Sequence, residues 1–209
     1  MANARSQFIA IAENAISDRT HELKHLPMSN TSPHTDILQK LIDSKDPVTG
    51  MALCGKPLVS EMVGVLIAGT DTTSNTLTWT TMHLMNHPEI YKRLCQDIRR
   101  EFPDLSKPIR YEEAKTHLPY LTAVILEAMR LTPSVAGFLP RRTPPEGTTI
   151  KGHFIPAMNE IGISIAAFHR NPNLWPNPST FDPERFMGTN MESNIKEILP
   201  FSTGKSGVG

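Results

Sequence analysis

This chain of 209 residues has few cysteines and no formal net charge. Its two cysteines, Cys54 and Cys95, are too few for a disulfide framework or a zinc site, so a reducing compartment is the simpler interpretation. The 21 lysines and arginines balance 21 aspartates and glutamates, and no overall electric field would therefore attract nucleic acid. The composition thus predicts a chain with no nucleic-acid partner.

Long hydrophobic runs are absent as well. The longest strongly apolar stretch, 62–68, is far shorter than the ~20 residues that span a bilayer. The first residues lack the charged and then apolar pattern of a signal peptide. Because 39% of the residues are hydrophobic, the chain can form a buried core, and a soluble globular protein is the default expectation. No anchor or export segment is predicted within the chain, and its localisation stays open.

The first 131 residues carry the periodicity of helices. Hydrophobic residues recur three and four positions apart, together with boundary signals. Asp36 is suited to cap a short helix, and Ser60 to begin a long apolar one. His87, which precedes Pro88, would end that long helix. We expect helices over about 4–24, 37–42, 60–86, from 88 onward and over 119–131.

Residues 132–209 favour short strands, turns and irregular coil. Prolines recur throughout this part, and each of them would interrupt a helix. Residues 149–155 and 161–165 alternate apolar and polar side chains, as short strands do. We therefore predict a mainly α fold with a small β region, an α+β arrangement, in a single domain that spans residues 1–209.

The segment Ala68–Thr73 is unusual for the middle of an apolar helix. Its glycine, aspartate and three threonines are poor helix formers, yet no signal ends the helix there. Threonine hydroxyls can bond to backbone carbonyls and bend a helix, and Gly69 would let a flat ligand approach the backbone. The acid and the alcohol at Asp71 and Thr72 could relay protons. A kinked helix with satisfied polar side chains is the structural alternative.

Glu127 and Arg130 lie three positions apart on the helix predicted over 119–131, so their side chains are neighbours. The residues around them are apolar, which favours a pair that faces inward, where a second cation would help to satisfy the carboxylate. The alternative is an exposed ion pair, which would contribute almost nothing to stability.

Four segments together resemble one known family. They are Ala68–Thr73, Glu127–Arg130, Phe181–Phe186 and Phe201–Gly204. Asp71 and Glu127 are 56 positions apart, and Glu127 and Arg185 are 58 positions apart. In this order and spacing the segments resemble the C-terminal half of a cytochrome P450, a haem-thiolate monooxygenase. The resemblance implies a partial cytochrome P450 fold, with a long central helix followed by helices and short strands, and haem as the cofactor.

The resemblance implies a catalytic pair and a structural triad. Asp71 and Thr72 match the acid and the threonine that deliver protons during O₂ activation, so they are the predicted catalytic residues. Glu127, Arg130 and Arg185 match a structural triad of the family.

The resemblance also implies a set of cofactor-binding residues. Ala68 and Gly69 match positions that border a face of the haem. Arg141 matches an arginine that contacts a haem propionate. Phe201 and Gly204 match the start of the loop that supplies the cysteine ligand of the iron.

The iron ligand itself departs from the family pattern. The family loop reads Phe-x-x-Gly-x-Arg-x-Cys-x-Gly, and an ungapped match from Phe201 places Ser206 at the arginine and Val208 at the cysteine. Two hypotheses follow. The first is a haem-dependent monooxygenase that inserts an oxygen atom from O₂ into an apolar organic substrate, with this chain inactive alone. The second is a non-catalytic remnant or an incomplete gene model.

The resemblance implies further partners and a setting. The family receives electrons from a reductase or a ferredoxin, and many of its members lie at the endoplasmic reticulum membrane. Residues 152–169 are most similar to fungal members of secondary metabolism. The residues themselves predict no metal site, because the histidine pairs His21 with His25 and His83 with His87 each lack a third ligand.

Overall fold

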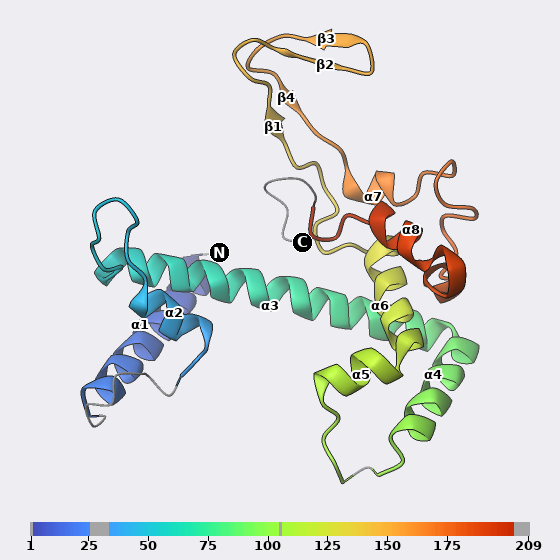
Figure 1. Ribbon diagram of the computed structural model, residues 1–209, viewed down its shortest axis with the longest axis horizontal. Coiled ribbons are helices and arrows are strands. Elements are labelled where there is room, and N and C mark those ends of the chain that lie inside the picture. The colour runs from blue at the N-terminus through green and yellow to red at the C-terminus, as the bar shows by residue number, and fades with distance from the viewer. Residues whose placement is uncertain (1, 26–33, 105, 203–209) are drawn as a thin grey trace. The chain divides into compact units, whose positions relative to one another are not determined.

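The computed structural model describes residues 2–25, 34–104 and 106–202 (Figure 1). They form two compact units, which divide between Thr73 and Ser74. None of the described helices has an apolar stretch long enough to cross a bilayer.

The first unit contains α1 (Ala2–His25), α2 (Ile37–Asp43) and the first part of α3 (Gly55–Asn86). The predicted cap of α2 is confirmed, because the Asp36 carboxylate accepts a hydrogen bond from the Gln39 amide at 2.9 Å. The same carboxylate pairs with Arg19 of α1 at 2.7 Å. The hydrogen bond from Arg19 lowers the pKa of Asp36 to about 2, so α1 and α2 are joined by a charged contact.

The long helix α3 begins five residues earlier than predicted, at Gly55. Gly55 has a φ of +61°, a left-handed conformation that glycine adopts without strain. Pro57 then lies in the first turn, where its missing N–H leaves no helical hydrogen bond unmade. The predicted start at Ser60 was wrong because this glycine and proline already provide a helix entry.

Helix α6 is the central element of the second unit. This unit contains α4 (Pro88–Glu101), α5 (Tyr111–His117) and α6 (Pro119–Leu131). The predicted helices from 88 onward and over 119–131 are confirmed, and α5 was not predicted. Side chains of α6 contribute to two buried clusters, so the helix is covered on more than one side. The first cluster comprises Leu94, Tyr120, Val124, Ala128, Leu131 and Phe181, and the second comprises Ala123, Trp175, Phe186 and Ile198.

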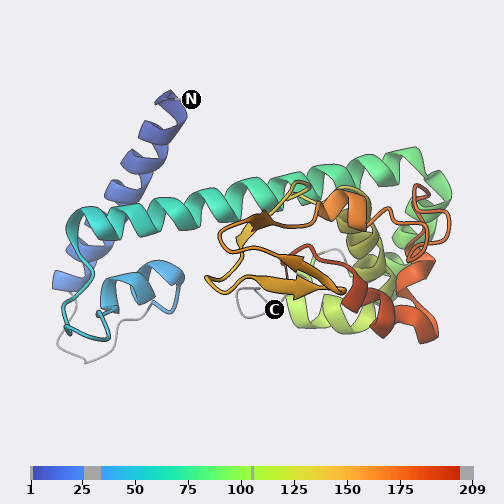
Figure 2. The same cartoon turned by 90° about the horizontal axis from the view of Figure 1, so that it is seen from above.

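The β region consists of two antiparallel strand pairs between α6 and α7 (Figure 2). Strand β1 (Arg141–Arg142) pairs with β4 (Glu160–Ile161), and β2 (Thr148–Ile150) pairs with β3 (His153–Ile155). The strand predicted over 149–155 is therefore a hairpin.

The strand predicted over 161–165 is also shorter than expected. It ends at Ile161, and α7 (Ile165–Phe168) begins where the strand was predicted to continue. Ser164 is the reason, because its hydroxyl accepts a hydrogen bond from the Ala167 amide at 3.4 Å and caps α7. The unit continues through two 3₁₀ helices, η1 (Pro183–Phe186) and η2 (Gly188–Asn190), to α8 (Met191–Glu197).

Candidate functional site

A fully buried ion pair lies at the centre of the second unit. Glu127 and Arg130 are 0% exposed, and both project from α6. The guanidinium of Arg130 donates from Nε to Glu127 Oε2 at 2.7 Å and from Nη2 to Glu127 Oε1 at 2.8 Å. This bidentate geometry is the strongest form of an arginine–carboxylate contact. The structure therefore selects the inward-facing pair over the exposed alternative.

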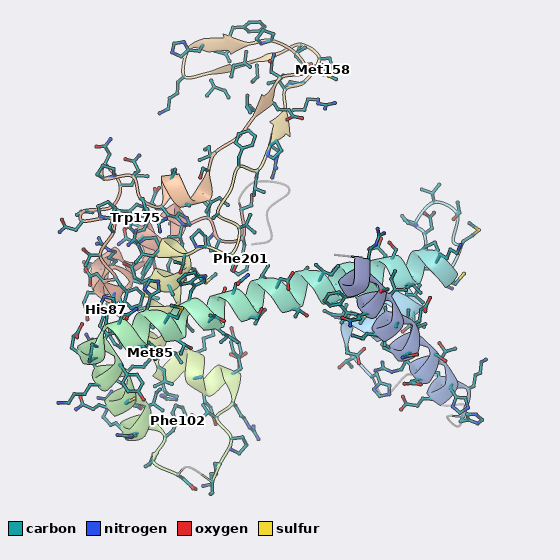
Figure 3. The ribbon with its side chains drawn as sticks, turned by 180° about the vertical axis from the view of Figure 1, so that it is seen from behind. Met85, His87, Phe102, Met158, Trp175 and Phe201 are labelled. Atoms are coloured by element: carbon teal, nitrogen blue, oxygen red, sulfur yellow. The ribbon has the colours of Figure 1, made fainter. Side chains whose placement is uncertain are left out.

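All five N–H groups of Arg130 are used. Three of its hydrogen bonds go to backbone carbonyls, those of His169 at 2.8 Å, Pro178 at 2.8 Å and Thr180 at 3.2 Å. The guanidinium carbon also lies 5.2 Å from the ring centre of Trp175, which is labelled in Figure 3. Arg130 thus ties α6 to the irregular segment between α7 and η1, because these carbonyls have no regular secondary-structure partner here.

Arg185 is the second cation beside the Glu127 carboxylate. Its Nε lies 3.3 Å from Glu127 Oε1, and its Nη2 donates to the Asn177 carbonyl at 3.0 Å. The amide of Asp182 donates to the same carboxylate oxygen at 2.9 Å. The structure thus brings together the three residues that the family resemblance grouped, which we call the Glu127 cluster: Glu127, Arg130 and Arg185.

The Glu127 cluster holds two cations and one anion. The Arg185 side chain is 10% exposed, whereas those of Glu127 and Arg130 are 0% exposed. The surplus positive charge therefore belongs to the member nearest to solvent, where its desolvation costs least.

His169 is a buried residue that the sequence did not mark as functional. It is 0% exposed, and each of its ring nitrogens has a backbone partner. Burial lowers the pKa of His169 to about 4, and the nearby charges of Arg130 and Arg170 act in the same direction. The imidazole is therefore neutral near pH 7. Its partners Arg130 and Leu199 are 39 and 30 positions away in the chain, so no local sequence pattern could have revealed it.

This histidine predicts a loss of stability in acid. Above pH 6.5 the His169 ring is neutral whether the chain is folded or unfolded. As the pH falls toward 4, only the unfolded chain binds the proton, so the free energy of unfolding should decrease by about 3 kcal/mol over this window. Urea unfolding at a series of pH values measures this slope. His169→Gln should flatten it, and the same slope in both proteins would contradict this origin.

Arg141 lines a shallow pocket of about 220 Å³ in the second unit. Its other lining residues are mostly apolar. Gly162 is required here, because a Cβ at this position would lie 2.6 Å from the Leu139 carbonyl oxygen. The arginine side chain is exposed, and among the described residues it donates one hydrogen bond, to the carbonyl of the adjacent Pro140. The remaining lining residues are Leu139, Ile163, Ile165, Leu199 and Ser202.

Phe201 and Gly204 were predicted from the ligand loop, and the structure describes the first of them. Phe201, which is labelled in Figure 3, is 63% exposed. It belongs to a turn in which the Ser202 amide donates to the Leu199 carbonyl at 3.2 Å. Gly204 lies outside the described residues.

The predicted catalytic residues lie on α3 in the first unit. The helix continues without interruption through Ala68–Thr73, and all of these residues are exposed. The Thr72 hydroxyl donates to the Ala68 carbonyl at 2.7 Å, which is the backbone contact expected of threonine in a helix. A Cβ on Gly69 would meet no atom within 4 Å, so the space next to this glycine is open. Asp71 and Thr72 are adjacent on this exposed segment.

The two cysteines lie far from the predicted ligand loop in the sequence. Cys54 is exposed just before α3, and Cys95 is partly buried on α4. Among the described residues, no group of three or more histidine, cysteine, aspartate or glutamate side chains could hold a metal ion.

Comparisons with known proteins identify the family. The sequence profile described as Cytochrome P450 matches residues 1–206. The curated monooxygenase helB1 of Aspergillus fumigatus is 30% identical over 198 residues, which are 95% of this chain and 33% of helB1. The monooxygenase sol6 of Alternaria solani is 38% identical over 70% of this chain and 32% of its own length. The chain belongs to the cytochrome P450 family.

Solved structures agree with this assignment. The retinoic acid-bound cyanobacterial CYP120A1 superposes with a TM-score of 0.80 at 26% identity, over 99% of this chain and 45% of that protein. The predicted α+β fold, a partial cytochrome P450 fold, is thereby confirmed. The chain spans about a third of the length of the curated relatives named above.

The Arg141 pocket fits the edge of a haem, the cofactor of this family. A haem edge combines an apolar ring with carboxylates, and the pocket combines apolar walls with one guanidinium. The position that matches the iron's cysteine ligand is Val208, which lies outside the described residues.

Proposed function

We propose that the full-length protein is a haem-dependent monooxygenase that acts on an apolar organic substrate. The observation that carries this proposal is the family match over residues 1–206. The reaction inserts one atom of O₂ into a C–H bond, and the other atom leaves as water. It consumes two electrons and two protons, with a reductase or a ferredoxin as the electron donor. Haem, when bound, supplies the iron at which O₂ is activated.

Residues of this chain would hold the cofactor and move the protons. The Arg141 guanidinium would bind a propionate carboxylate, since it lines the apolar pocket and its hydrogen bond to the Pro140 carbonyl leaves other N–H donors for a bidentate contact. Ala68 and Gly69 would border the ring, because the space next to Gly69 is open. Asp71 would take protons from solvent, and the hydroxyl of Thr72 would hand them on.

Replacement of Thr72 by alanine should leave haem binding intact and divert reduced oxygen to peroxide. The hydroxyl that times proton delivery would be lost. Loss of a general acid commonly lowers the rate by about 10² to 10⁴-fold, and we expect the coupling to fall by a factor near the lower end of this range. The product formed per reduced nicotinamide consumed measures this coupling. The experiment requires a polypeptide extended at both ends with the corresponding segments of a full-length relative.

Thr78 provides a matched control for this variant. It is also exposed on α3, and its hydroxyl donates to the Ser74 carbonyl at 2.8 Å, as Thr72 does to Ala68. Thr78→Ala should therefore keep the coupling. Asp71→Asn should lower it as Thr72→Ala does, and unchanged coupling in both of those variants would remove the proton relay from the proposal.

A non-catalytic remnant is the second candidate. It is favoured by one feature of the sequence, the valine at position 208 in a chain whose cysteines occur only at 54 and 95. On this hypothesis the 209-residue polypeptide has no monooxygenase activity and at most binds a partner. Translation of the nucleotides that follow the codon for Gly209, in all frames, distinguishes the candidates. A Cys-x-Gly followed by an amphipathic helix would support the enzyme, and its absence would support the remnant.

A further inference from the structure

His169 connects two parts of the second unit through its ring. Its Nδ1 lies 3.1 Å from the carbonyl oxygen of Arg130, at the end of α6. Its Nε2 lies 2.8 Å from the backbone amide of Leu199. A carbonyl oxygen only accepts and an amide only donates, so the proton must be on Nδ1 and the lone pair on Nε2. The two contacts fix one neutral tautomer.

Leu199 is held at both of its backbone polar groups. Its amide donates to His169, and its carbonyl accepts from the Ser202 amide at 3.2 Å. The four residues 199–202 therefore form a turn whose first residue is fixed to the buried imidazole. Ser202 has a φ of +64°, which is uncommon outside glycine and persists only when the surroundings define it.

The same turn forms one wall of the Arg141 pocket. Leu199 and Ser202 both line it, and the adjacent Ile198 is buried against Trp175. Apolar packing of Ile198 restrains the chain at this point, but it is not directional. The hydrogen bond from Leu199 to His169 supplies the direction.

We infer that His169 is a positioning residue that sets the Leu199–Ser202 turn, and with it one wall of the Arg141 pocket, against the end of α6. The role as a pocket wall for a cofactor rests on the proposed function. The placement of the turn does not, because it follows from contacts within the chain.

Two variants separate the two hydrogen bonds of His169. In His169→Gln the side-chain oxygen extends to the ε position and can still accept from the Leu199 amide. In His169→Asn the side chain ends at the δ position, so it can donate to the Arg130 carbonyl but cannot reach Leu199. A role in general packing would affect both variants alike.

Hydrogen exchange of the Leu199 amide in the 209-residue chain tests the inference without haem. The amide should exchange about tenfold faster in His169→Asn than in the wild type, and His169→Gln should restore most of the protection. Exchange in the 148–155 hairpin should not change. Equal exchange in the wild type and His169→Asn, or equal acceleration in both variants, would overturn the inference. A long-range ¹H–¹⁵N spectrum should show the Nδ1–H tautomer, and an Nε2–H tautomer would also overturn it.

The link to the cofactor has its own measurement. In the polypeptide extended at both ends, His169→Asn should retain less haem than His169→Gln at equal protein concentration. Equal retention in both variants would overturn the link to the pocket. If the extended wild type binds no haem, the proposed function fails, whereas the exchange result still decides the placement of the turn.

Discussion

Replacing Glu127 by glutamine is expected to lower the free energy of unfolding of the second unit by about 3 to 5 kcal/mol. The substitution keeps the shape of the side chain and removes its charge, so Arg130 and Arg185 remain in the interior without an anion. Natural domains are stable by only about 5 to 15 kcal/mol, and the loss is therefore a large fraction of the total. The urea midpoint should fall sharply. Tryptophan fluorescence reports on this unit because Trp79 and Trp175 both belong to it.

The pair Asp97 and Arg100 is the matched control. It has the same three-residue spacing on a helix and a distance of 2.9 Å, but the Arg100 side chain is 66% exposed. Water screens such a pair, and Asp97→Asn should therefore cost less than about 1 kcal/mol. If Glu127→Gln has the midpoint of Asp97→Asn, the Glu127 cluster does not stabilise the unit as we infer.

The helices could be predicted from the sequence because their signals are local. Pro88 lies in the first turn of α4, and Pro119 lies in the first turn of α6. The spacing of Glu127 and Arg130 likewise placed their side chains on one helix face, and the apolar neighbours indicated that this face is buried. Arg185 was grouped with them through the family resemblance, since its distance of 58 positions carries no local signal.

The sequence predicted a β region, but its division into strands could not be predicted in the same way. The hairpin turns at Lys151 and Gly152, whose φ values of 48° and 82° are both left-handed. Glycine adopts this conformation readily, but lysine rarely does, so the pair does not read as a turn in the sequence. The alternating pattern of residues 149–155 therefore favoured one continuous strand.

The contacts of His169 also could not be predicted from the sequence. A histidine in an apolar segment is compatible with a buried or an exposed position. Only the fold brings the Arg130 carbonyl and the Leu199 amide to opposite sides of its ring. The same holds for Arg130, whose three carbonyl partners lie 39 to 50 positions along the chain.

The carbon monoxide spectrum of the reduced protein with haem tests the proposed function most directly. Two polypeptides are compared, the 209-residue chain and a version in which the segments before Met1 and after Gly204 come from a full-length relative with its cysteine loop. The extended version should show the red-shifted Soret band of a thiolate-ligated ferrous carbonyl. The 209-residue chain should not, because Val208 has no lone pair to offer the iron. An extended version without this band would contradict the haem monooxygenase, and the band in the 209-residue chain would identify Cys54 or Cys95 as the ligand.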